Sequence, residues 1–599
     1  MSQATTINGD FILAAGPQSA QWLAGVEGFT VSPAHREGDL QLATRGAVLE
    51  GIADTGDHWL ALADLIEGHI VDAINNPEAF TQKKWRGRFA CAHWNARAPS
   101  SLQVFTDHFG SLPVYWYQRD GHYAVASDLR LLLQAPGVRR EPDLHAVYDY
   151  LNFSCIPAPR TICRDIRRVE PGTRLVLSET RAELHRYYLP EYPEDLHGDD
   201  KALAEGLNQR IVRTVQDFRP REGGGWGCFL SGGTDSSSIV SILARQQDQS
   251  DRVQSCSIGF PEAGYDELDF ARLASEACGA QPHLAQVDRE RGLGLLDSVI
   301  AAYDQPFGNA SAIPTLACAA LGQSQGFEVM LGGDGGDEIF GGNQRYAKDK
   351  VMESFYRLPS PLKAAAQQLG KALGGGNNHL LNRVRNFTER ASLPNPDRFY
   401  TDDSFASDFY DELLTPEFRS QVGRDASLDF MRKVYALGED AEPLHKIMRL
   451  DLLMAIAQND IVKVHRACKH HGVSARFPYL DPALVDYCGR LAAKHKVRGF
   501  KKRFLFKRAM ADVLPQAILS KPKQGFGLPV AIWLKEDPSL QARVRDVLLD
   551  RRTRERGWIN PEFISRLVEM HMAGGWDHSA AIWQLLVLEL WMRSYMDER

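Results

Sequence analysis

Hydrophobic and polar positions follow different patterns in two parts of the chain. Up to about residue 190, short apolar runs such as RFACAHWNA (88–96) and LPVYWYQRDGHYAVAS (112–127) are separated by breaks rich in Gly, Pro and Asp. Short runs with turn residues between them predict antiparallel strands. We therefore expect an antiparallel β-rich domain over residues 1–195, followed by a linker at the Pro-rich, acidic stretch YLPEYPEDLHGDD (188–200).

Beyond residue 200, apolar runs of strand length alternate with amphipathic runs of helix length. The expected strands are WGCFL (226–230), VQSCSIGF (253–260) and FEVMLGG (327–333), and the expected helices cover 201–218, 235–247, 266–278 and 313–325. This alternation predicts an α/β domain with a doubly wound parallel sheet. From about residue 343 the pattern is almost wholly helical, so we expect the second domain, 201–599, to carry a mostly helical extension. Within that extension, residues 344–445 indicate no chemistry.

Composition narrows the class of protein. The 599 residues are 44% hydrophobic and 24% charged, which is typical of a soluble globular protein, and the chain is too long for a single core. A net charge of −7 argues against nucleic acid as the main partner, although the basic run KHKVRGFKKRFLFKR (494–508) is suited to a small anion. No apolar run approaches the roughly 20 residues of a membrane span. The nine cysteines form no metal or disulfide pattern, so we expect a cytoplasmic protein.

The stretch GCFLSGGTDSSSIVSIL (227–243) joins a strand to a helix through two glycines. Glycines let the backbone approach a ligand, and the first N–H groups of a helix attract anions, so the segment is typical of a phosphate site. Ser231, Ser236, Ser237 and Ser238 add hydroxyl groups. Asp235 is explained if a cation such as Mg²⁺ lies between it and the phosphates. A turn with a helix N-cap, and no ligand, is the alternative interpretation.

A second glycine-rich acidic stretch, EVMLGGDGGDEIFGG (328–342), also follows an expected strand. In a parallel sheet both stretches emerge at the carboxyl edge, where ligands bind. Asp334, Asp337 and Glu338 would add carboxylates there. Neither the GxxxxGK[ST] loop nor GxGxxG is present, so the pair indicates a phosphate and metal site of another kind.

Several ordered motifs resemble the ATP-pyrophosphatase domain of the asparagine synthetase family. They are FLSGGTDSS, SCSIGF, DQPFGNASAIP, VMLGGDGGDEIFGG, KVHRACKHHGVSARFPYLD, KRFLFKRAM, LSKPKQGFGLPV and AIWQLLVLELW, spread over about 205–343 and 445–595. The resemblance implies that Mg-ATP adenylates a carboxylate, that pyrophosphate leaves, and that an amine then attacks to form an amide.

The resemblance also assigns roles to residues of this sequence. It implies ATP or pyrophosphate binding by Leu230, Ser231, Gly232, Gly233, Thr234, Asp235, Ser236, Ile258, Gly332, Gly333, Lys521 and Lys523, and Mg²⁺ binding by Asp235 and Asp337. Asp334 stands where the family has a glutamate, and it would position or deprotonate the amine. Lys502 or Arg503, with Lys501 adjacent, would face the tetrahedral intermediate. His465 stands where the family has an aspartate, which places a group with an ordinary pKa near neutral on that helix.

The amino-terminal domain resembles the glutaminase domain of the family only in part. The stretches from RGRFACAHWN to TDHFGSLPVYWY fit that resemblance, but position 2 is Ser2 where glutamine-dependent members carry a cysteine nucleophile, and the motif Asn-Gly-Glu-Ile-Tyr-Asn is missing. We therefore expect a degenerate glutaminase-like domain of the amino-terminal nucleophile type, without glutaminase activity.

The amine acceptor is the least determined part of the prediction. The helical region 344–445, the basic run 494–508 and the stretch FGSLPVYW (109–116) most resemble lasso peptide cyclases, which join an Asp or Glu side chain of a precursor peptide to the peptide's own amino terminus. It implies a precursor peptide as substrate, with a leader-binding protein and a leader protease as partners. The alternatives are amide formation on a small amino acid with ammonia or an internal amine, as in asparagine or β-lactam synthetases, and a non-catalytic ATP-binding assembly protein.

Overall fold

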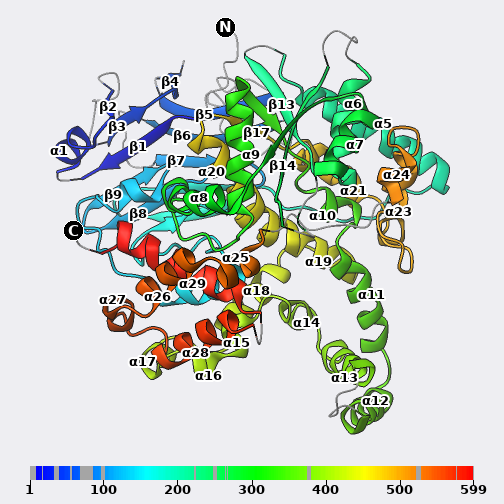
Figure 1. The fold of residues 1–599 in the computed structure, drawn as a ribbon. Coiled ribbons are helices and arrows are strands. Elements are labelled where there is room, and N and C mark those ends of the chain that lie inside the picture. The colour runs from blue at the N-terminus through cyan, green and yellow to red at the C-terminus, as the bar shows by residue number, and fades with distance from the viewer. Residues whose placement is uncertain are drawn as a thin grey trace.

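The computed structural model describes residues 8–16, 18–32, 40–53, 57–67, 85–95, 102–221, 224–246, 252–262, 265, 268–373, 379–520, 528–574 and 577–597. Two six-stranded sheets and one five-stranded sheet are found in this part of the chain. Figure 1 shows the strands of the first two sheets, in blue and cyan, together on one side of the molecule.

The amino-terminal strands form two antiparallel sheets that pack face to face. The first has the order β10-β8-β9-β1-β3-β2, with β1 Asp10–Ala15, β2 Thr30–Val31, β3 Leu40–Arg45, β8 Tyr115–Arg119, β9 His122–Ala126 and β10 Arg167–Arg168. The second has the order β12-β11-β7-β6-β5-β4, with β4 Leu49–Ile52, β5 Asp57–Glu67, β6 Arg86–Asn95, β7 Leu102–Thr106, β11 Thr173–Leu177 and β12 Ala182–Arg186. The antiparallel fold expected from the sequence is confirmed.

Side-chain alternation explains why the two sheets associate. Phe11 and Leu13 of β1 point into one apolar core together with Leu60 of the opposite sheet, while Ile12 and Ala14 point to the other side. Both faces of β1 are therefore covered. The outer face packs against the short helices α1 (Ser19–Ala24) and α3 (Leu129–Leu132), and α4 (Leu144–Phe153) extends the same core toward the rest of the chain.

The third sheet is parallel and has the order β15-β14-β13-β16-β17. Its strands are β13 Gly225–Phe229, β14 Gln254–Gly259, β15 Gln281–Gln286, β16 Phe327–Leu331 and β17 Ser474–Arg476. Its neighbouring helices are α5 Asp200–Phe218, α6 Thr234–Ala244, α7 Leu268–Cys278, α8 Arg289–Ala302 and α9 Ala312–Ser324. The chain builds outward from β13 to β15 and then returns to the other side of β13 with β16, so the strand order reverses between β13 and β16. Ligands of parallel sheets bind at such a reversal, beyond the carboxyl ends of the strands.

The rest of the chain is helical, as the sequence predicts. Its helices are α10 Gly336–Phe340, α11 Gln344–Tyr356, α12 Ser360–Leu373, α13 His379–Ala391, α14 Asp397–Tyr400, α15 Phe405–Asp408, α16 Tyr410–Leu413, α17 Pro416–Arg419, α18 Ala426–Tyr435, α19 Pro443–Asp451, α20 Ile461–His470, α21 Pro482–Gly489, α22 Ala493–Lys496, α23 Phe504–Ala509, α24 Gln516–Ser520, α25 Val530–Glu536, α26 Pro538–Leu548, α27 Arg551–Glu555, α28 Pro561–Met572 and α29 Ser579–Tyr595. A π-helical segment, Leu452–Asp460, joins α19 to α20. Helices α11, α12 and α13 project away from the body of the protein (Figure 1). No helix in the described residues is both long and apolar enough to cross a membrane.

The stretch 188–200, expected to be a linker, is packed against the carboxyl-terminal part of the chain. The Tyr192 ring stacks on His445 with 4.5 Å between ring centroids, and Leu196 forms a β-bridge with Leu491. The stretch therefore forms almost no helix or strand, yet it is held against the rest of the protein by these contacts.

Candidate active site

The first glycine-rich loop begins where β13 ends. The Leu230 N–H donates to the carbonyl of Cys256 on β14 at 3.0 Å, and α6 begins four residues later at Thr234. Gly232 has a φ of +68°, a conformation that side chains rarely adopt. The Ser236 hydroxyl accepts from the Ser231 N–H at 3.2 Å. These contacts hold a tight turn that directs the start of α6 toward the end of the sheet.

Two of the four serines expected to add hydroxyl groups to the phosphate site do not line the cavity. Ser237 and Ser238 are fully buried, and the Ser238 hydroxyl contacts the Tyr479 hydroxyl inside the protein. They occupy the buried side of α6, so the prediction was wrong for these two hydroxyls. Ser231 and Ser236 do line the cavity.

The second glycine-rich loop touches the first. A Cβ added at Gly333 would lie 2.9 Å from the Ser236 amide nitrogen, and one added at Gly336 would lie 2.6 Å from the Asp235 carboxyl carbon. Only glycine permits this approach, because a real Cβ essentially never comes within 3.0 Å of such atoms. Parallel pairing of β13 with β16, in which Cys228 faces Leu331, sets the two loops side by side.

Asp235 and Asp337 converge on one nitrogen atom. The Nη2 of Arg503 donates to Asp235 Oδ2 at 2.5 Å and also to Asp337 Oδ1. Burial by itself lowers the pKa of Arg503, but the two carboxylates outweigh burial and raise it. The arrangement brings two residues 102 positions apart within reach of one cation.

Asp334 lies in the cavity wall. Removal from water raises the pKa of its carboxyl to about 6, since the positive charge of Lys463 only partly offsets that effect and Asp460 and Asp235 add to it. Lys463 Nζ donates to Asp460 Oδ1 at 2.6 Å. Burial lowers the pKa of Lys463, yet Asp460 and Asp334 together raise it above its ordinary value. A carboxyl group that titrates near neutral pH is suited to proton transfer.

The cavity around these residues has a volume of about 840 Å³. The predicted site residues that line it are Leu230, Ser231, Gly233, Thr234, Asp235, Ser236, Ile258, Gly333, Asp334, Asp337, Lys502 and Arg503. Gly232 and Gly332 belong to the two loops but do not line it, and Lys521 and Lys523 lie outside the described residues. Asp460, Lys463, Lys507, Asn309 and Ser311 line the cavity without having been predicted.

Three of the cavity residues that were not predicted belong to motifs already quoted from the sequence. Asn309 and Ser311 belong to DQPFGNASAIP, in which the Asn309 amide donates to Asn459 at 2.9 Å. Lys463 begins KVHR, the motif in which the sequence draws attention to His465 instead. His465 is buried against Arg88 of β6, whose Nη2 lies 2.8 Å from its Nδ1. Burial and the neighbouring Arg88 lower the pKa of His465 well below its ordinary value, so the expectation of titration near neutral pH was wrong.

The site suits Mg²⁺ bound together with a polyphosphate. Mg²⁺ is usually held by one or two carboxylates and by phosphate oxygens, with few other protein ligands. The described residues contain no cluster of three or more His, Cys, Asp and Glu side chains that could hold a metal without such help. A positively charged guanidinium already lies between Asp235 and Asp337, so the pair accommodates a cation.

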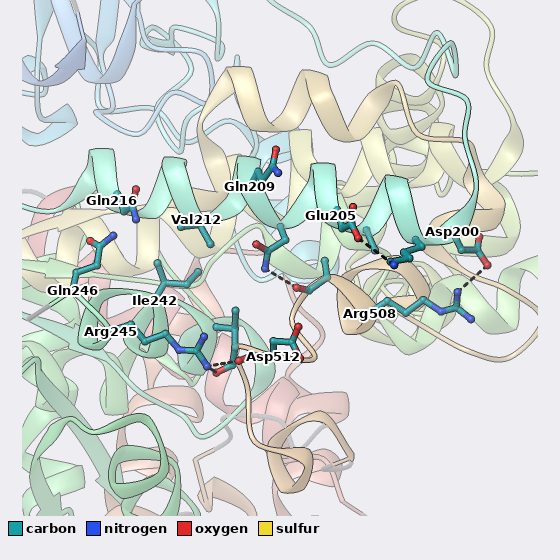
Figure 2. A pocket seen from close by; sticks show the side chains of 15 residues that line it. Asp200, Glu205, Gln209, Val212, Gln216, Ile242, Arg245, Gln246, Arg508 and Asp512 are labelled. Carbon is teal, nitrogen blue, oxygen red and sulfur yellow. Dashed lines mark hydrogen bonds and ion pairs between the residues drawn. The ribbon is translucent and has the colours of Figure 1, made fainter.

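A second cavity, of about 720 Å³, lies along α5 and is bordered by α23 and the end of α6 (Figure 2). None of the predicted site residues lines it. Arg508 pairs with Asp200 across its edge at 3.0 Å, and Arg498 pairs with the same carboxylate at 2.8 Å. Arg498 and Arg508 of the basic run 494–508 therefore share one carboxylate within the protein, and the cationic groups of the run in the active-site cavity are Lys502, Arg503 and Lys507.

Comparisons with known proteins show which families the two parts of the chain match. The family model described as asparagine synthase matches residues 208–593, and that described as a glutamine amidotransferase domain matches 70–188. A putative asparagine synthetase (glutamine-hydrolyzing) of Mycobacterium tuberculosis (strain ATCC 25618 / H37Rv) is 27% identical over 86% of this chain and 78% of its own. Asparagine synthetase (glutamine-hydrolyzing) 1 of Bacillus subtilis (strain 168) is 25% identical over 86% of this chain and 79% of its own. A solved allosteric regulatory enzyme of purine biosynthesis aligns with 46% of this chain and 80% of its own, with a TM-score of 0.21 and 11% identity, which is too remote to support an argument.

Proposed function

The chain belongs to the asparagine synthase family, and from that membership we propose that it is an ATP-dependent ligase that activates a carboxylate as an acyl-adenylate and passes the acyl group to an amine. The observation that supports this most directly is the convergence of Asp235 and Asp337 beside the two contacting glycine-rich loops. The loops lie at the strand-order reversal of the parallel sheet, where a nucleotide is expected.

In this proposal the loop 231–236 holds the phosphates through backbone N–H groups and the Ser231 hydroxyl. Asp235 and Asp337 would hold Mg²⁺, which neutralises the charge that develops on the leaving pyrophosphate. The substrate carboxylate attacks the α-phosphate, and AMP remains attached to it until the amine arrives. Lys502 and Lys507 in the cavity wall place further positive charge near the phosphates.

Asp334 would accept the proton that the attacking amine loses. Its raised pKa, about 6, leaves it ionised at neutral pH but basic enough to take a proton. Lys463 and Asp460 would position this carboxylate and the substrate, because they lie in the same wall of the cavity. Most of the rate enhancement would then come from holding the amine against the activated acyl group.

For the amine we propose the amino terminus of a precursor peptide, which would attack its own activated Asp or Glu side chain and close a macrolactam. The support is the sequence resemblance to lasso peptide cyclases described above. The helices α11 to α13 offer additional surface for a peptide or for a leader-binding partner.

A second candidate is glutamine-dependent amide formation on a small amino acid. The match of residues 70–188 to a glutamine amidotransferase domain favours it, as do the names of the two relatives. The sequence-based expectation of a domain without glutaminase activity concerns Ser2, which lies outside the described residues.

Pyrophosphate release tests the shared chemistry, and product analysis separates the two candidates. The enzyme is incubated with Mg-ATP and either a precursor peptide, or aspartate with glutamine or ammonium. Asp235→Asn is expected to abolish pyrophosphate release with every substrate, whereas Asp512→Asn, an exposed aspartate of the second cavity, should retain it. A peptide product lighter by one water supports the cyclase, while asparagine formation supports the alternative. Normal release by Asp235→Asn would refute the proposed site.

A further inference from the structure

The position of Arg503 has a consequence for how metal and nucleotide enter the site. We propose that the Arg503 guanidinium, which lies between Asp235 and Asp337, competes with the divalent cation for this position and must leave it before the metal binds. The inference rests on the proposed function, because it takes the metal to be held by these two carboxylates. It makes Arg503 an internal competitor of the metal, and it makes nucleotide binding the event that removes that competitor.

The geometry permits one cation at a time. A single atom, Arg503 Nη2, contacts both carboxylates, so these oxygens are already drawn together around a positive charge. Mg²⁺ takes oxygen ligands at about 2.0–2.1 Å, and the guanidinium already holds one oxygen of each carboxylate. There is little spare room on the far side, since a Cβ added at Gly342 would collide with Asp337 Oδ1 and with Arg503 Nε.

The charges of these groups also disfavour the presence of the metal and the guanidinium at this position together. Asp235 and Asp337 carry two negative charges and Arg503 carries one positive charge, and Arg503 is only 8% exposed. A divalent ion placed beside the retained guanidinium would give the cluster a net positive charge with poor access to solvent. Like charges at close range are costly in such surroundings. Metal alone would therefore have to displace Arg503 before a phosphate is present to bind the guanidinium.

The arginine backbone is held in place, so displacement would concern the side chain. Arg503 has a φ of +53°, and its N–H donates to the Gly341 carbonyl at 3.1 Å immediately before α23 begins. Lys502 and Lys507 flank it in the cavity wall, where the phosphates are proposed to lie. Guanidinium groups bind phosphate well, so a polyphosphate would accept Arg503 from the carboxylates as the metal replaces it. Metal and nucleotide binding would consequently be cooperative.

Manganese titration followed by electron paramagnetic resonance measures this coupling without turnover. Mn²⁺ is added to the full-length protein with and without α,β-methylene-ATP. We expect the wild-type protein to bind Mn²⁺ weakly alone and much more tightly with the analogue. Arg503→Gln should bind Mn²⁺ alone about tenfold more tightly than wild type, and the gain produced by the analogue should shrink. Arg498→Gln removes the same charge from a surface pair with Asp200 and should behave as wild type.

Two further variants locate the binding site and guard against misfolding. Adding Asp235→Asn to Arg503→Gln should remove the new Mn²⁺ binding. Arg503→Lys keeps the positive charge and should bind Mn²⁺ alone with an affinity between those of wild type and Arg503→Gln. Removing Arg503 takes a positive charge away from two part-buried carboxylates, so Mn²⁺ should raise the midpoint of thermal unfolding of Arg503→Gln more than that of wild type.

The outcomes distinguish this inference from the proposed function. If Mn²⁺ binds wild type in the presence of the analogue but Arg503→Gln gains no affinity for Mn²⁺ alone, the competition is refuted and the proposed metal site survives. If no variant binds Mn²⁺ even with the analogue, both the inference and the proposed metal site are refuted.

Discussion

Asp334 and Asp337 stand three positions apart in the second glycine-rich stretch, Asp334 before α10 and Asp337 in its first turn, and their surroundings differ. Asp337 pairs with the Arg503 guanidinium, while the pKa of Asp334 is raised to about 6 by burial and by nearby carboxylates. A paired carboxylate is suited to holding a cation, and one with a raised pKa is suited to accepting a proton. Two residues of the same type therefore have different proposed roles because of their neighbours.

Asp334→Asn should reduce amide formation by about 10²-fold or more while leaving adenylation nearly intact, because only the amine step needs the base. Pyrophosphate–ATP exchange measures adenylation, and product formation measures the complete reaction. In the wild type the base is active when ionised, so the rate of the amine step should rise with pH through about 6. Equal loss of exchange and product would contradict this role.

At the scale of elements, the position of the site depends on two strand-to-helix loops in contact. Helix α6 follows β13 and helix α10 follows β16, and the parallel pairing of these strands places the loops together. Glycines at the contact remove the side chains that would separate the loops. The loops can thus share one ligand although they are distant in sequence.

Gly336→Ala should weaken nucleotide binding by separating the loops, since its Cβ would lie 2.6 Å from the Asp235 carboxyl carbon. Titration with a fluorescent ATP analogue measures the dissociation constant. Gly294→Ala is a matched control, because that glycine lies within α8 and its Cβ would meet nothing within 4 Å. The control should bind normally and gain up to about 1 kcal/mol of stability from helix propensity. Unchanged binding by Gly336→Ala would show that the close contact is not needed.

At the scale of the whole molecule, buried ion pairs join the amino-terminal sheets to the parallel sheet. Arg476 of β17 pairs with Asp64 of β5 through two hydrogen bonds, at 2.8 and 2.6 Å. The Arg476 carbonyl also accepts from the N–H of Gly332 in the second loop, at 2.9 Å. The interface between the two parts of the chain is therefore connected to the active site.

Asp64→Asn should lower the free energy of unfolding by about 3 kcal/mol, because Arg476 would stay buried with its charge uncompensated. Urea denaturation measures the loss, and pyrophosphate release should fall with it because Gly332 is held through Arg476. Asp120→Asn alters an ion pair with Arg119 in which the aspartate is 78% exposed, and should change stability by less than about 0.5 kcal/mol. Similar effects of the two substitutions would indicate that the buried pair contributes little.

Several elements could not be predicted from their own residues. Strand β15, QPHLAQ, is a polar edge strand, and β17 has only three residues, so neither shows an apolar run of strand length. The wall formed by Asp460 and Lys463 depends on a π-helical segment in a region whose pattern indicates only a helix. These elements form because neighbouring strands and helices supply the hydrogen bonds and the burial.

Local sequence determined the alternation of strands and helices and the two glycine-rich acidic loops, because periodicity, turns and backbone freedom are properties of adjacent residues. The same information left open which of Lys501, Lys502 and Arg503 enters the site. Tertiary structure decided this: Lys501 is exposed, Lys502 lines the cavity, and Arg503 joins two aspartates that follow different strands. That meeting depends on strand order and on the packing of segments more than 100 residues apart, and no local pattern contains this information.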